Sequence, residues 1–90
     1  MHRTITLSVD VELLDAVACG HRPAEGPWAD VVATLPLGRE RPRAVPVTAT
    51  VRAWREFCCV AGCEPRLRVP ALRLQARMIR AMAAWAPRPV

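Results

Sequence analysis

The sequence predicts a mostly helical α+β protein made of two strand-helix-helix units, with two short strands and four helices. Two observations carry this prediction. Apolar and polar side chains alternate in residues 4–9 and again in residues 47–52, which is the period of a strand with one buried face. Each alternating stretch then runs directly into apolar residues at helical spacing. Because an isolated strand is not stable in water, both strands must pair with another segment.

The first unit spans residues 1–37 and begins with the strand at residues 4–9. Asp10 follows the strand as a helix N-cap, and Gly20 is a natural end for the helix. Residues 21–27 hold two prolines and a glycine, which predict a loop, and the next helix begins at Trp28 and ends before Pro36. The apolar residues on these elements are Ile5, Leu7, Val9, Val11, Leu14, Val17, Ala18, Trp28, Val31, Val32 and Leu35.

A polar, proline-rich linker at residues 38–46 precedes the second unit, which spans residues 47–90. The strand at 47–52 leads into a helix that ends near Gly62 and carries Trp54, Phe57, Cys58 and Ala61 on one stripe. The longest helix is expected over residues 71–85. Its expected apolar stripe is Leu72, Ala76, Ile79, Met82 and Ala83, with Arg73, Arg77 and Arg80 on a flanking face.

The two units align in pattern, although few residues are identical. Their strands match at an offset of 42 residues and their first helices at an offset of 43, so a one-residue adjustment at the turn reconciles them. An internal duplication and a chance recurrence of short patterns both explain this alignment.

The length and composition are those of one small globular domain. The chain has 90 residues, of which 52% are hydrophobic and 23% charged, a balance typical of a folded protein. It contains no run of 18 apolar residues, so neither a transmembrane helix nor a membrane partner is expected. Its first residues carry acids where a signal peptide needs an apolar segment, and we therefore expect a cytoplasmic protein.

The positive charge is concentrated in the second half of the chain. Residues 1–44 contain five arginines and six acids, whereas residues 45–90 contain eight arginines and two acids. A basic half favours a polyanionic partner such as nucleic acid. A second interpretation stays open, because all 13 of the Lys and Arg residues are arginine, as in proteins of GC-rich genomes.

The four cysteines are expected to be reduced thiols, buried as small apolar side chains. An alternative is a zinc site formed by Cys19, His21, Cys59 and Cys63. Their spacing differs from the usual paired zinc ligands, so no metal and no other cofactor is expected. No arrangement typical of a catalytic site or of a phosphate-binding loop is found, and the protein is not expected to be an enzyme.

The stretch ITLSVDVELLDAV resembles the opening of ribbon-helix-helix DNA-binding proteins of the MetJ, Arc and CopG type. The resemblance covers residues 3–35 and, more loosely, residues 46–85. It implies that the two strands pair as an antiparallel ribbon, packed on the four helices, which lies in the DNA major groove. It also implies either a homodimer or a tandem single chain that forms a pseudo-dimer by itself.

With the apolar strand faces inward, short polar side chains and one arginine face outward. These are the expected base contacts: Thr4, Thr6, Ser8, Thr48, Thr50 and Arg52. The resemblance adds phosphate contacts near the start of the last helix, where we expect Arg66, Arg68 and Arg73. The outward threonines have a second interpretation, since threonine is common on the solvent side of any sheet.

Two functions follow as hypotheses. The first is a transcription regulator, such as a repressor, that binds operator DNA through the ribbon. The second is a small protein-protein interaction module or inhibitor, for example one encoded by a phage. In that case the basic half would bind an acidic protein or a nucleic-acid-binding protein.

Overall fold

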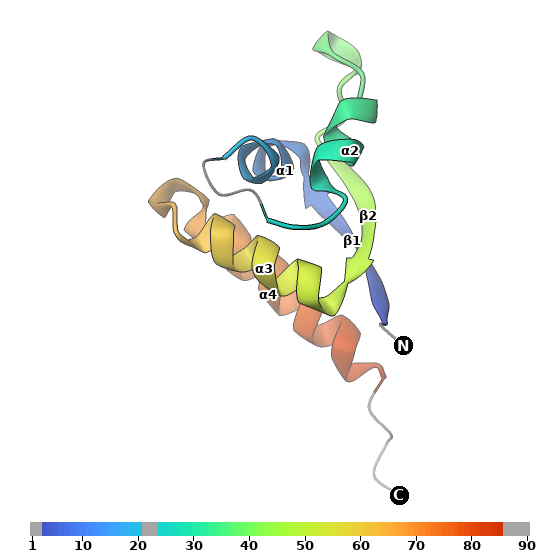
Figure 1. Ribbon diagram of the computed structural model, residues 1–90, viewed down its shortest axis with the longest axis vertical. Coiled ribbons are helices and arrows are strands. Elements are labelled where there is room, and N and C mark those ends of the chain that lie inside the picture. The colour runs from blue at the N-terminus through green and yellow to red at the C-terminus, as the bar shows by residue number, and fades with distance from the viewer. Residues whose placement is uncertain (1–2, 21–23, 86–90) are drawn as a thin grey trace, which may run out of the picture.

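The computed structural model describes residues 3–20 and 24–85, and its fold is mostly helical α+β with a two-stranded antiparallel sheet, as the sequence predicts (Figure 1). Within these residues no helix is long and apolar enough to cross a membrane. The elements in chain order are β1 (Thr4–Asp10), α1 (Val11–Ala18), α2 (Trp28–Thr34), the short 3-10 helix η1 (Gly38–Glu40), β2 (Ala44–Thr50), α3 (Val51–Gly62), the 3-10 helix η2 (Pro65–Leu67) and α4 (Arg68–Ala83).

The two strands pair with each other along their full length. The register places Thr4 opposite Thr50 and Asp10 opposite Ala44. Burial alternates strictly along β1, with Ile5, Leu7 and Val9 on the covered face. The indole N–H of Trp54 donates a hydrogen bond of 3.0 Å to the backbone carbonyl of Ile5, which ties α3 to the start of β1.

Strand β2 begins at Ala44, three residues before the start that the alternation indicated, and it ends at Thr50 rather than at position 52. The expected linker is correspondingly shorter, because residues 44–46 are strand. Pro46 is tolerated because both strands of a two-stranded sheet are edge strands, where a missing N–H need not leave a carbonyl unpaired. Arg52, expected on the strand, belongs to the first turn of α3.

One hydrophobic core joins the two halves of the chain. Trp28 from α2 packs against Trp54 and Phe57 from α3, with ring centroids 4.8 and 4.5 Å away, and all three side chains are fully buried. Helix α1 packs on α2 and α3, while α4 packs on α3 and β1. The core also takes in the apolar face of the ribbon, so the strands and all four helices stabilise one another.

The elements repeat at a spacing of 40 residues rather than the 42 and 43 inferred from the pattern. The strands begin at Thr4 and Ala44, the helices that follow them at Val11 and Val51, and the second helices at Trp28 and Arg68. At this spacing no adjustment is needed between strand and helix. Buried residues match as well, because Leu14 corresponds to Trp54 and Val17 to Phe57.

Helix α4 differs from the prediction in its start and in the face that it buries. It begins at Arg68, and Pro70 fits in its first turn because amides there have no intrahelical carbonyl to bind. The buried residues are Ala71, Leu74 and Met78. Of the expected stripe, Met82 packs partly buried against the core. The other four residues face solvent, because the side chains that contact the core lie on the opposite side of the helix; they are Leu72, Ala76, Ile79 and Ala83.

Candidate nucleic-acid interface

The outer face of the β1–β2 ribbon is open and carries hydroxyl side chains. Because the helices cover the other face, the side chains between the buried positions are exposed. Four of the expected base-contact residues lie here: Thr4, Thr6, Ser8 and Thr48. The antiparallel register brings them together from two segments about 40 residues apart in the chain.

Thr6 and Thr48 stand directly opposite each other, and their hydroxyl oxygens are 2.6 Å apart, a hydrogen bond between the strands. One hydroxyl donates to the other, so the pair keeps one free O–H donor together with unused acceptor lone pairs. Their methyl groups are apolar contact points beside this donor. The pair therefore presents a small mixed surface near the middle of the ribbon.

Thr50 has a different role from the one that its position in the alternation predicts. Its side-chain oxygen accepts a hydrogen bond of 3.1 Å from the backbone N–H of Ala53, and it is the N-cap of α3. The side chain is partly buried. Its hydroxyl oxygen is thus engaged in ending the strand and beginning the helix.

Two arginines lie near the end of the ribbon where Thr4 faces Thr50. Arg52 is exposed in the first turn of α3, directly after the strand. Arg3 precedes β1, and its guanidinium carbon lies 5.0 Å from the centre of the Trp85 ring. At the opposite end, Asp10 and Glu12 are exposed. Arg41 and Arg43 lie beside these two acids. The end with Arg3 and Arg52 is therefore positively charged, whereas the end with Asp10 carries charges of both signs.

The three expected phosphate-binding arginines lie farther away, around the start of α4. Arg66 is in η2, and its guanidinium pairs with Glu64 at 2.6 Å, a contact that raises the pKa of Arg66. Arg68 begins α4, and Arg73 is exposed in the next turn. Helix α3, whose 12 residues extend over about 18 Å, runs from Arg52 to the turn that precedes η2. The expected contacts therefore form two groups rather than one site.

The four cysteines differ in their exposure to solvent. Only Cys58 is buried, whereas Cys19, Cys59 and Cys63 are exposed, so the expectation of four buried thiols is wrong for three of them. Among the residues that the structure describes, no group of three or more His, Cys, Asp and Glu side chains could hold a metal ion. His21, the fourth residue of the alternative zinc set, lies outside the described residues.

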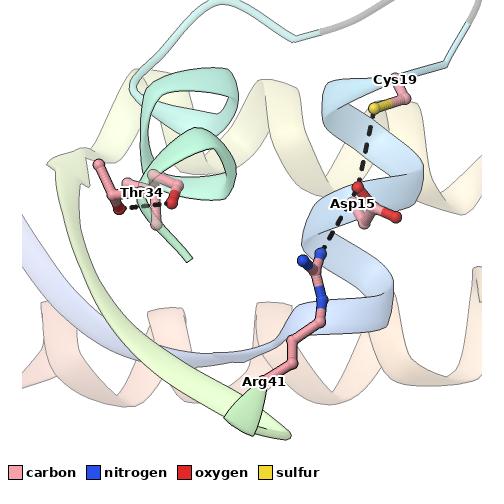
Figure 2. A network of polar contacts seen from close by, with 5 residues as sticks. Asp15, Cys19, Thr34 and Arg41 are labelled. Carbon is pink, nitrogen blue, oxygen red and sulfur yellow. Dashed lines mark hydrogen bonds and ion pairs between the residues drawn. The ribbon is translucent and has the colours of Figure 1, made fainter. Parts of the chain in front are cut away.

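Polar contacts on α1 connect the first unit to the segment before β2. Figure 2 shows Asp15, whose carboxylate oxygen lies 3.8 Å from the guanidinium of Arg41 and 3.7 Å from the Cys19 thiol. The backbone N–H of Val11 also donates to the carbonyl of Arg43 at 2.8 Å, which extends the pairing of the ribbon by one bond. These contacts position the start of β2 against α1.

Sequence reasoning missed two members of the outer face. Pro46 stands opposite Ser8, and Ala44 stands opposite Asp10. A signal for both was present, because Val45 continues the apolar alternation of Val47 toward the N-terminus. The prolines of this segment favoured a linker instead, since proline is rare within sheets.

Comparison with known proteins found no matching family model, no matching curated protein and no matching solved structure. The ribbon-helix-helix resemblance therefore stays a prediction from the sequence pattern. What the chain presents by its own geometry is a two-stranded ribbon with an open, hydroxyl-bearing face, backed by four helices.

Proposed function

We propose that the protein is a DNA-binding regulator that places the open face of the β1–β2 ribbon in the major groove. The observation that carries this proposal is the exposed hydroxyl face of a ribbon whose other face is sealed by helices. A two-stranded ribbon is one of the two elements that fit the major groove of B-form DNA. Helices on one side only leave the other side free to enter it.

The side chains on this face suit contact with base edges. Thr6 and Thr48 are short, so the strand backbones can approach the bases closely. Their shared O–H donor can bind an acceptor such as N7 or O6 of guanine, and their methyl groups can contact the thymine methyl. With Thr50 engaged as a cap, we assign base contacts to Thr4, Thr6, Ser8 and Thr48.

The arginines supply the contacts to phosphate. Arg52 follows the ribbon on α3, so we assign it to a flanking phosphate instead of a base. Arg68 and Arg73 extend the same role to a second position on the DNA backbone. Arg66 is a weaker candidate, because a phosphate must compete with Glu64 for its guanidinium. The net charge of +5 favours association with DNA.

One chain supplies both strands of the ribbon. Ribbon-helix-helix proteins build theirs from two protomers, and here the 40-residue spacing of the elements allows the two halves of one chain to take those places. We therefore propose that the protein binds DNA as a single-chain pseudo-dimer, in which each half of the chain lies over one half of the DNA site.

The first test is the placement of a negative charge on the ribbon. Thr6→Glu puts a carboxylate at its centre, where DNA phosphates repel it. We expect the affinity for duplex DNA to fall at least about tenfold at low salt. Binding is measured by fluorescence anisotropy with a pool of short duplexes of randomised central sequence, and then with the duplex that selection enriches.

Thr34→Glu is the matched control, because it makes the same change at an exposed threonine at the end of α2. It should leave DNA binding close to that of the unchanged protein. Far-UV circular dichroism verifies the fold of both variants. The proposal fails if the unchanged protein does not bind duplex DNA at about 50 mM salt, or if the two variants lose affinity equally.

A further inference from the structure

The outward side of α4 carries an apolar stripe that nothing in the described chain covers. Val69, Leu72 and Ile79 are 58%, 58% and 55% exposed, and the exposed Ala76 and Ala83 complete the stripe. Their spacing alternates between three and four residues, which is the pattern of a helix that packs lengthwise against another helix. The stripe lies opposite the buried Leu74 and extends over about 21 Å.

The edges of this stripe are positively charged. Arg73 and Arg80 follow one edge, with Arg77 beside them, and all three side chains are exposed. Arg68 lies near the other edge at the start of the helix. The 16 residues of α4 include no aspartate or glutamate that would neutralise this charge. A complementary surface must therefore be apolar along its middle and acidic along its sides.

A groove between α3 and α4 runs beside the stripe and widens the apolar surface. Its volume is about 370 Å³, and its lining comprises Arg55, Cys58, Cys59, Gln75, Met78, Ile79 and Met82. Ile79 belongs to both the stripe and the groove. Methionine side chains adapt their shape to a partner, so this groove suits the large apolar side chains of a second helix. Arg55 adds positive charge on its far wall.

The charge argues against two other occupants. A second copy of α4 would bring arginines against arginines without any acid between them, which is unfavourable at close range. Nucleic acid would satisfy the arginines, but it would leave the aliphatic side chains of Val69, Leu72 and Ile79 against a charged backbone. Only a partner that is both apolar and acidic complements the apolar stripe together with the arginines at its edges.

We propose that the outward side of α4 binds an acidic amphipathic helix of a partner protein. The partner's apolar residues pack on the stripe and in the groove at heptad spacing, and its Glu or Asp side chains pair with Arg73 and Arg80. This site is separate from the open face of the ribbon, but it shares Arg73 with the proposed phosphate contacts. A DNA phosphate and an acidic partner would therefore compete for this one side chain. The hypothesis of a protein-protein interaction module thereby gains a defined surface, the outward side of α4, and a defined type of partner, an acidic amphipathic helix.

The test uses a library of three-heptad helical peptides displayed on phage, with apolar residues varied at the a and d positions and glutamate held at e and g. The full chain is the target, and an enriched peptide is then labelled for anisotropy. The double variant Leu72→Gln with Ile79→Gln should bind it at least about tenfold more weakly. Leu37→Gln, at an apolar residue that is 83% exposed elsewhere, should bind it unchanged.

Two changes test the role of charge in binding the peptide. Replacing the glutamates of the enriched peptide with lysines should abolish its binding. The double variant Arg73→Gln with Arg80→Gln in the protein should weaken binding of the unchanged peptide. Failure to enrich any peptide, or equal binding of the lysine peptide, overturns the proposal. It is also overturned if Leu72→Gln with Ile79→Gln abolishes self-association or weakens binding of duplex DNA, since either result would assign the stripe to another occupant. Loss of DNA binding in Thr6→Glu leaves this proposal intact.

Discussion

At the scale of single residues, Thr50 decides where β2 ends. Thr50 is the last residue of β2 and pairs with Thr4, so the alternation predicts its side chain on the outer face with Thr48. Its hydroxyl oxygen instead accepts the backbone N–H of Ala53 and satisfies one of the amides that the first turn of α3 leaves without a partner. Arg52 is thereby moved from the ribbon to the helix. A single local hydrogen bond changes which residues lie on the outer face of the ribbon.

Cys58 is a second residue with a measurable consequence. Burial raises the pKa of its thiol from 9.0 to about 11. The chain has no lysine or tyrosine, so no side-chain amine or phenol titrates in this range. The unfolded chain ionises Cys58 first, so its contribution to stability is complete below pH 9.0 and is lost as pH rises to about 11. We expect the free energy of unfolding to fall by on the order of 2 kcal/mol across that interval.

Urea unfolding under reducing conditions, at both ends of this pH interval, measures the loss. Cys58→Ala removes the buried thiol and should show a much smaller decline over the same interval, although it starts from a lower stability. An equal decline in the variant would mean that another group causes the alkaline loss. The exposed Cys19, Cys59 and Cys63 are present in both proteins and serve as the internal reference.

At the scale of elements, α4 has two apolar stripes of nearly equal quality. One contains Ala71, Leu74 and Met78, and the other contains Leu72 and Ile79. Only one can face the core, and the packing of α4 against α3 and β1 selects the stripe of Leu74. The unselected stripe is left on the surface, where it becomes the proposed site for a partner helix.

This orientation predicts unequal effects for the same substitution two positions apart. Leu74 is fully buried, so Leu74→Ala should lower the free energy of unfolding by about 2–5 kcal/mol through lost contacts and a cavity. Leu72 is 58% exposed, and Leu72→Ala should cost less than about 1 kcal/mol. Urea unfolding of both variants measures the difference. Similar costs at the two positions would contradict the observed face of α4.

At the scale of the whole molecule, the two halves have no separate cores. The ribbon takes one strand from each half, and Trp28 of the first half packs against Trp54 and Phe57 of the second. Neither half can bury its apolar strand face without the other. The repeat of elements at 40 residues therefore does not divide the chain into two independently stable units.

We therefore expect one cooperative unfolding transition. In a Trp85→Phe background, tryptophan fluorescence reports only on Trp28 and Trp54, whereas far-UV circular dichroism reports on all helices. The two signals should change with the same midpoint in urea, because both depend on the shared core. Separate midpoints would show that the halves unfold independently. The Phe57→Leu variant, with a weakened core, should shift both midpoints together.

Local periodicity by itself determined much of this protein. The alternation in residues 4–9 predicted β1 and its buried face, and the helical spacing of Trp54, Phe57, Cys58 and Ala61 predicted the buried stripe of α3. It also predicted the exposure of Thr4, Thr6, Ser8 and Thr48. These features follow from neighbouring residues, since a strand or helix has a fixed period that places its apolar side chains on one side.

Only the tertiary structure decided the register of β1 against β2, the end of β2 at Thr50 and the face that α4 buries. Register depends on contacts between segments about 40 residues apart, which no local pattern contains. The choice between the stripes of Leu74 and Leu72 depends on which fits the surface formed by α3 and β1. For the same reason Arg52 left the predicted ribbon site, and the apolar stripe of α4 came to face solvent.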